Sequence, residues 1–229
     1  MNTIEWIDYA AFIWFVALVF GYQMVAGFPS MNARSIAGAI QRHRVEWMRG
    51  TAERDNRSAD AILLGTLSQG NAFFASTSAI AIGGLAAIIG SGDKADAFLD
   101  RIPFVAKSSP LLWEVKIILL IGIFVFAFFK FAWAFRLTHY TAIMIGAMAN
   151  PGRGEAAQVE RQIEDTARLS GLAAEHSNSG LRSFYYAAAA MTWFFNPVLF
   201  MAATAWVAAI LVRRDFFSRS QRLVAARWR

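Results

Sequence analysis

The chain has 229 residues, of which 57% are hydrophobic and 17% are charged, with a formal net charge of +6 and no cysteine. Soluble domains are about half apolar and about a quarter charged, so this composition excludes an ordinary soluble domain and indicates one polytopic membrane domain. The absence of cysteine excludes disulfides, thiolate metal sites and cysteine nucleophiles.

Four apolar stretches, at about residues 8–28, 61–90, 111–138 and 183–212, predict an all-α integral membrane bundle of four transmembrane helices. Each is long enough for the bilayer core, which takes roughly 20 helical residues. The first follows Glu5 and Asp8 and lacks the basic start and the cleavage site of a signal peptide, so we predict an uncleaved helix. Tyr22, in its last turns, is expected to anchor at the interface and to hydrogen-bond a neighbouring helix.

Amphipathic connecting helices are predicted on one side of the bundle, at about residues 31–57 and 154–176. The first carries arginines opposite an apolar flank, and the second has i,i+4 pairs such as Arg161 with Asp165. We expect the two connectors to pack together as a small helical cap. The first connector either binds an acidic lipid or partner or simply faces water and headgroups.

The segment after the fourth span interleaves arginines with aromatic residues, a pattern typical of attachment to anionic headgroups or to a protein partner. The basic residues expected to face lipid or a partner are Arg34, Arg42, Arg44, Arg213 and Arg214.

The second span has a stripe of small residues at every fourth position, namely Ala75, Ala79, Gly83 and Ala87. Such a stripe lets another helix approach closely in a membrane, so it predicts a helix-packing face. The first half of this span is unusually polar. Its Gln69 and Asn71 either form interhelical hydrogen bonds or line a water-filled path.

The third span contains charged residues at two depths. Glu114 and Lys116 are two positions apart, so they do not face each other on a helix, and both are expected to reach the interface. Lys130 lies deeper. It either extends its flexible stem to the interface or pairs inside the membrane, with Glu114 of a neighbour or with a substrate anion.

Asn178–Gly180 predicts a break before the fourth span, and Pro197 predicts a kink inside it. Asn196 is then expected to be buried beside freed carbonyl groups. Together these residues define a candidate intramembrane polar site, which consists of Gln69, Asn71, Glu114, Lys130 and Asn196.

Four spans would place both termini on one side of the membrane, and the two sides would carry nearly equal basic charge. The first helix has acids before it and arginines after it, which favours outside termini and a cytoplasmic cap.

Chemistry-bearing patterns are sparse. The three histidines, His43, His139 and His176, show no metal or haem spacing, and there is no phosphate-binding glycine loop or nucleophile elbow. We predict no catalytic residue, no metal ion, no cofactor and no nucleic-acid partner, because no recognition motif accompanies the positive charge.

Several runs of residues, in this order along the chain, resemble an uncharacterised family of four-helix membrane proteins from bacteria and plants: Met31–Arg34, Arg54–Arg57, Phe73–Thr77, Trp113–Lys116, Phe128–Trp133, Asn178–Tyr186 and Arg213–Ser218. The resemblance covers essentially the whole chain. It implies a four-helix membrane fold and assigns no activity, ligand or site residue.

These patterns favour a non-catalytic integral membrane protein, expected in the bacterial inner membrane, that acts through helix–helix contacts. It would be an oligomer or an accessory subunit of a larger membrane complex. The alternative is a small homo-oligomeric channel or transporter, suggested by Lys130 and by the polar half of the second span.

Overall fold

The computed structural model describes residues 3–28, 31, 34–90, 109–149 and 155–226, and all regular elements in these ranges are helices. They are α1 (Thr3–Gly27), α3 (Ile36–Ala52), α4 (Ser58–Gly90), α6 (Pro110–Gly146), α7 (Ala156–Met191), the short 3-10 helix η1 (Thr192–Phe194), α8 (Pro197–Phe217) and α9 (Arg219–Ala225). The predicted all-α fold is confirmed.

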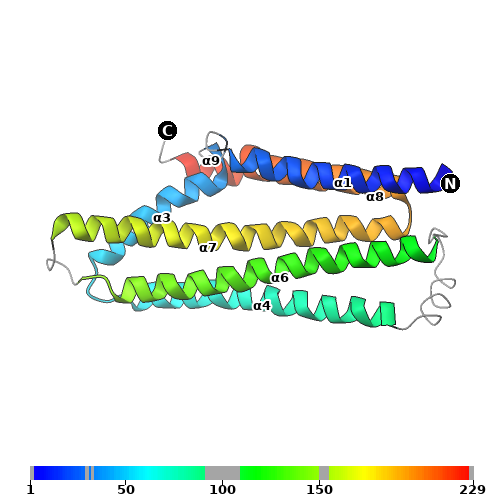
Figure 1. Ribbon diagram of the computed structural model, residues 1–229. Helices are drawn as coiled ribbons and strands as arrows, with labels where there is room; N and C mark the ends of the chain where they lie inside the picture. Colours follow the sequence, from blue (N-terminus) through cyan, green and yellow to red (C-terminus); the bar gives the residue numbers. More distant parts are fainter. Residues whose placement is uncertain (1–2, 29–30, 32–33, 91–108, 150–154, 227–229) are drawn as a thin grey trace.

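Five long helices lie side by side along one axis, and they form a row (Figure 1). α4 packs on α6, α6 on α7, α7 on α8, and α8 on α1. α3 crosses this row obliquely at the end where α9 also lies. α4 therefore lies at one edge of the row.

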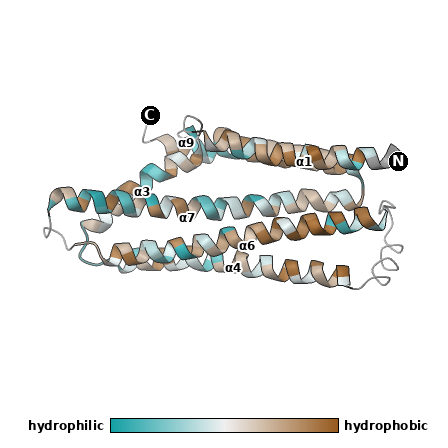
Figure 2. Ribbon diagram, in the orientation of Figure 1, coloured by the Kyte–Doolittle hydropathy of each residue, from teal (hydrophilic) through white to brown (hydrophobic). Residues whose placement is uncertain are grey.

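Four of these helices are long and apolar enough to cross a membrane: Trp6–Ala26 in α1, Ser58–Gly90, Pro110–Gly146, and Pro197–Ala225. This confirms the predicted number of candidate spans. Figure 2 shows hydrophobic residues along most of α1 and along the parts of α4 and α6 away from α3, with hydrophilic residues concentrated on α3 and on the adjoining part of α7.

The core has two parts. Aromatic side chains from α1, α7, η1 and α8, including Phe15, Tyr186, Trp193 and Phe200, pack together between the α1–α8 pair and the rest of the row. A second cluster around Met48 joins α3 to α4, α6 and α7.

The connecting helix α3 packs on the first half of α7, as the sequence predicts. Gln41 donates a hydrogen bond to the carbonyl of Ala167 (2.9 Å), and Arg49 forms an ion pair with Glu160. Arg57, after α3, donates to three carbonyl groups at the end of α6 at distances of 2.8–3.1 Å. These orphan carbonyls need donors because a helix end leaves them unpaired.

α6 is longer than predicted. Ser109 caps its first turn by accepting from the backbone N–H of Leu112, and Pro110 takes the first helical position, where its missing N–H costs nothing. The helix continues past residue 138 to Gly146, because polar residues that favour exit from a membrane do not stop a helix. The segments that join α4 to α6 and α6 to α7, residues 91–108 and 150–154, lie outside the described residues.

The predicted break at Asn178–Gly180 is wrong, because α7 is continuous from Ala156 to Met191. Gly180 is buried, and a Cβ there would lie 2.6 Å from the ring of Phe131. The glycine therefore serves a close approach of α6 to α7. The predicted connector 154–176 and the first residues of the predicted fourth span belong to one helix.

The predicted kink at Pro197 is also wrong. The chain turns back at η1, and α8 runs beside α1 in the opposite direction to α7 (Figure 1). Asn196 is extended (φ −161°), as the residue before a proline prefers, and its Oδ1 caps α8 by accepting from Val198 (2.7 Å) and Leu199 (3.3 Å). Asn196 is exposed rather than buried. The fourth span is thus α8 and not residues 183–212.

This turn corrects the position of the termini. α7 makes a fifth pass along the row besides the four apolar helices, so the start of α1 and the helix α9 lie at opposite ends of the α1–α8 pair (Figure 1). The prediction that both termini lie on one side is wrong for that reason.

Candidate functional site

A buried ion pair joins three helical elements near the amino-terminal end of the row. Asp8 of α1 and Lys116 of α6 are 3% and 1% exposed, and Lys116 Nζ lies 3.7 Å from Asp8 Oδ1. Trp193 of η1 donates its indole N–H to the same carboxylate oxygen at 2.6 Å, and Lys116 Nζ lies 5.4 Å from the centroid of its ring. Trp193 in turn stacks on Phe200 of α8.

A second buried carboxylate, Asp215 of α8, lies near the other end of the α1–α8 pair. It accepts a hydrogen bond from the hydroxyl of Tyr22 on α1 and pairs with Arg182 of α7 at 3.1 Å and with Arg214 at 3.0 Å. The guanidinium of Arg182 lies 5.1 Å from the centroid of the Tyr22 ring, within cation–π range. The predicted hydrogen bond from Tyr22 to a neighbouring helix is present.

These two clusters hold α1 and α8 against α6 and α7. In an apolar interior a carboxylate is stable only when it is paired and hydrogen-bonded, and both conditions are met at each site. Among the described residues, no three His, Asp or Glu side chains form a group that could hold a metal ion.

The five residues of the predicted intramembrane polar site are not brought together. Gln69 is exposed on α4, Asn71 is buried on it, and Glu114 is exposed near the start of α6. Lys130 lies about 24 Å further along α6 at about 1.5 Å per residue. Asn196 lies in the turn before α8. They form no common site within one chain.

Three of the four residues of the small-residue stripe are exposed and do not pack within the chain. Ala75 is half-buried, whereas Ala79, Gly83 and Ala87 are exposed on the edge helix α4. A Cβ at Gly83 would meet no atom within 4 Å. The face is therefore free for contacts outside this chain.

The predicted basic residues divide into two groups. Arg34 and Arg213 are exposed, whereas Arg42 and Arg44 are half-buried and Arg214 is engaged by Asp215. Burial lowers the pKa of Arg44.

The carboxyl-terminal helix α9 packs on α3. His43 Nε2 lies 2.9 Å from the carbonyl oxygen of Val224, and the side chain of Gln221 donates to the carbonyl of Arg34 at 2.9 Å. Phe217 and Leu223 remain 72% and 77% exposed, so this end keeps an apolar surface beside its arginines. The tail beyond residue 226 lies outside the described residues.

The buried ion pair of Asp8 and Lys116 and the buried carboxylate of Asp215 were not predicted from the sequence. Lys116 was expected at the interface, yet it is sealed in the core against Asp8, a residue 108 positions earlier. Asp215 follows two arginines and resembles part of a solvated tail. The one available signal for each was an acid or base inside, or directly beside, an apolar run, where charges are rare and usually paired.

An open groove on α6 and α7 is lined by basic and aromatic side chains. It has a volume of about 460 Å³ and is lined by Phe126, Phe129, Lys130, Ala132, Trp133, Arg136 and His176. Burial and the nearby charge of Lys130 both lower the pKa of His176 on α7.

An all-helical fold with four helices able to cross a membrane defines this chain as a membrane protein of the helical-bundle class. It belongs to the DUF599 family of proteins of unknown function, which it matches over residues 10–220. Comparisons with curated proteins and with solved structures give no match. The resemblance stated from the sequence is confirmed at the level of an uncharacterised family.

Proposed function

We propose that this chain is a non-catalytic integral membrane protein that works through helix–helix contacts of α4, as an oligomer or as an accessory subunit of a larger membrane complex. The observation that carries the proposal is the outward face of α4. It is a long apolar helix at the edge of the row, and only 6% of its most apolar window is buried within the chain.

The residues on that face suit a protein neighbour. Gln69, Phe73, Ser76, Ile80, Gly83 and Ala87 are all exposed and follow one another at alternating spacings of four and three. That spacing forms a continuous stripe like the contact seam of two packed helices. In a membrane, small side chains allow close approach and polar ones supply interhelical hydrogen bonds, so a stripe that mixes large, small and polar residues favours a helix over lipid tails.

The test is the native mass of the protein gently solubilised from its own membrane. A multiple of 25.4 kDa supports an oligomer, and a mass that includes other proteins supports an accessory role. A purely monomeric mass would overturn the proposal.

The variant Ala79→Leu with Gly83→Leu should reduce either assembly, because it adds bulk at two exposed positions of the small-residue stripe of Ala75, Ala79, Gly83 and Ala87 on α4. The matched control adds leucines to the exposed face of α8, as Ala202→Leu with Ala209→Leu, and should leave assembly unchanged.

A homo-oligomeric channel is the second candidate, favoured by the exposure of Gln69 and Ser76 on the same face. If copies meet through α4, these groups border the contact. Gln69→Leu should then lower ion or solute flux in reconstituted vesicles while the assembled mass stays the same. Unchanged flux would reject this candidate.

We further propose the bacterial inner membrane as the location, with the α3–α9 end in the cytoplasm. The arginines of α3, of the first half of α7 and of α9 all lie at that end. Basic residues mark the cytoplasmic side. The carboxyl-terminal end is then cytoplasmic and the amino-terminal end external.

A chain without cysteine allows this orientation to be read with single cysteines and a membrane-impermeant maleimide. In intact cells Phe195→Cys, in the turn before α8, should be labelled, and Ser220→Cys, on α9, should be labelled only after permeabilisation. Trp206→Cys, exposed in the middle of α8, should resist labelling in both. The reverse pattern would invert the orientation.

A further inference from the structure

The groove on α6 and α7 combines positive charge with aromatic surface. Lys130 and Arg136 flank Trp133 along α6, and His176 completes the lining from α7. Lys130 Nζ lies 5.1 Å from the centroid of the Phe126 ring, and Arg136 donates to the hydroxyl of Tyr140 at 3.1 Å. The lining includes no carboxylate.

The two basic residues that α6 contributes to the groove form no ion pair among the described residues. Among the described residues, neither Lys130 nor Arg136 has an acidic side chain within ion-pair distance, in contrast to Arg49, Arg54, Arg182 and Arg214, which all do. Burial is the main cause of the lowered pKa of His176; the charge of Lys130 lowers it further, and the charge of Glu175 acts in the opposite direction. An anion in the groove would relieve this mutual repulsion.

Counted from Pro110, where the apolar helix α6 begins, the groove lies one bilayer core away, which matches the depth of lipid phosphates. Lys130 is 20 positions after Pro110, which is about 30 Å along the helix and equals the thickness of a bilayer core. Trp133 is 48% exposed at this level. An exposed tryptophan beside lysine and arginine is typical of the headgroup region.

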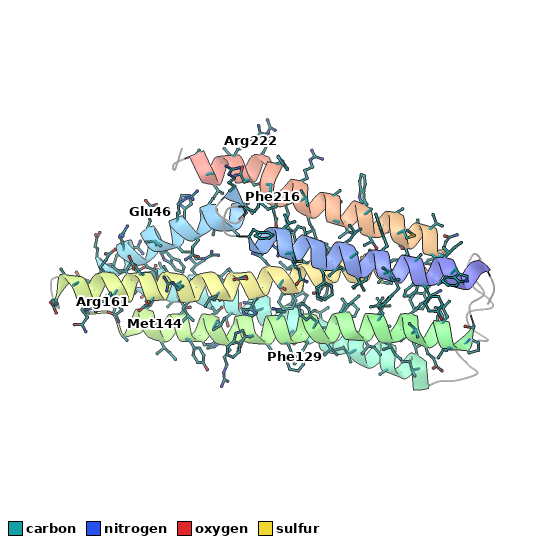
Figure 3. The ribbon with its side chains drawn as sticks, turned by 45° about the horizontal axis from the view of Figure 1, so that its top comes forward. Glu46, Phe129, Met144, Arg161, Phe216 and Arg222 are labelled. Carbon is teal, nitrogen blue, oxygen red and sulfur yellow. The ribbon has the colours of Figure 1, made fainter. Side chains whose placement is uncertain are left out.

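The part of the groove nearer the start of α6 is apolar. Phe126 and Phe129 are 41% and 65% exposed and lie on the side of Lys130 that leads towards the start of α6, that is, into the bilayer core. Phe129 projects away from the bundle (Figure 3). The groove therefore has a cationic end at the interface and an aromatic end along the acyl chains.

We propose that this groove is a binding site for one anionic phospholipid, with its phosphate between Lys130 and Arg136 and an acyl chain over Phe126 and Phe129. A soluble anion would use the cationic end alone and would leave the two exposed rings without a role. The complementarity of both ends favours a lipid of the cytoplasmic leaflet over a free phosphate.

The test is native mass spectrometry of the protein in nanodiscs of phosphatidylcholine with added phosphatidylglycerol. The wild type should retain one phosphatidylglycerol more tightly than phosphatidylcholine. The variant Lys130→Gln with Arg136→Gln should bind it roughly ten- to thirtyfold more weakly, because each basic residue near the surface strengthens attraction to anionic lipid about fivefold.

The matched control is Arg161→Gln with Arg168→Gln, which removes the same charge from two exposed positions on α7. It should keep the retained lipid, and melting of both variants confirms that they fold. Equal retention by all three proteins, or equal retention of the zwitterionic lipid, would overturn the proposal. Displacement of the lipid by millimolar inorganic phosphate would show that a free anion, not a phospholipid, is the occupant.

Discussion

Asp8 and Asp215 are buried carboxylates near opposite ends of the α1–α8 pair, and their charges are balanced in different ways. The cation that pairs with Asp8 is 1% exposed, whereas the side chains of Arg182 and Arg214, which pair with Asp215, are 20% and 39% exposed. A cation that reaches water or headgroups keeps solvation when its partner is lost. A cation buried in the core has no such solvation to fall back on. The stability of the fold should therefore depend more on Asp8 than on Asp215.

The largest effect is expected at the sealed site. Asp8→Asn removes the carboxylate that lies 3.7 Å from the buried ammonium group of Lys116, which should destabilise the protein by about 3–5 kcal/mol. Adding Lys116→Met to Asp8→Asn removes the buried cation as well and should recover most of that loss. Unfolding of detergent-solubilised protein, followed by circular dichroism, measures both. If the double variant were no more stable than the single one, the loss of stability would come from the weakened hydrogen bond to Trp193 and not from the charge of Lys116.

Asp215→Asn should cost less, about 1–3 kcal/mol, because the amide still accepts from Tyr22 while both arginines can turn to solvent. The same unfolding assay applies. A loss of stability equal to that of Asp8→Asn would mean that solvent does not stabilise the two arginine charges once Asp215 is neutral. The predicted contrast between the two sites would then be wrong.

Tyr22→Phe tests the hydrogen bond alone and should cost about 1 kcal/mol. The chain offers a matched control in Tyr186, whose hydroxyl is buried without a hydrogen-bond partner among the described residues. Tyr186→Phe removes no such bond and should be neutral or slightly stabilising. Equal losses in the two variants would show that aromatic packing, and not the bond to Asp215, is what the assay detects.

The helices that the sequence predicted well are those whose signals are local. A long apolar run defines α1, α4 and α6, and alternating charge with an apolar flank defines α3. The turn before α8 was misjudged because Asn196 and Pro197 are compatible both with a kinked helix and with a new capped one. Their apolar surroundings suit either reading, and only packing against α1 decides between them.

The site was less predictable because its contacts are long-range. Gly180 carries the same local signal whether it ends a helix or admits a neighbour's ring, and the neighbour, Phe131, is remote in sequence. Likewise, nothing near Lys116 indicates Asp8 as its partner. By contrast, the small-residue stripe of α4 is visible in the spacing of the sequence alone, and its role as a packing face stays a prediction. What the structure adds is that this face points away from the chain's other helices.

The smallest effect is expected from Arg214→Gln. Its side chain is 39% exposed, and Asp215 keeps Arg182 and Tyr22, so the loss should be below about 1 kcal/mol and should shrink further at high salt. Arg182→Gln should cost more, since Arg182 also lies on the Tyr22 ring and is half as exposed. Measuring both variants at low and high salt sharpens the comparison between the two carboxylates. If Arg214→Gln proved the more destabilising variant, the charge of Asp215 would be neutralised mainly by its most exposed partner. Arg182 could then not replace Arg214, and Asp215 would depend on a single cation as Asp8 does.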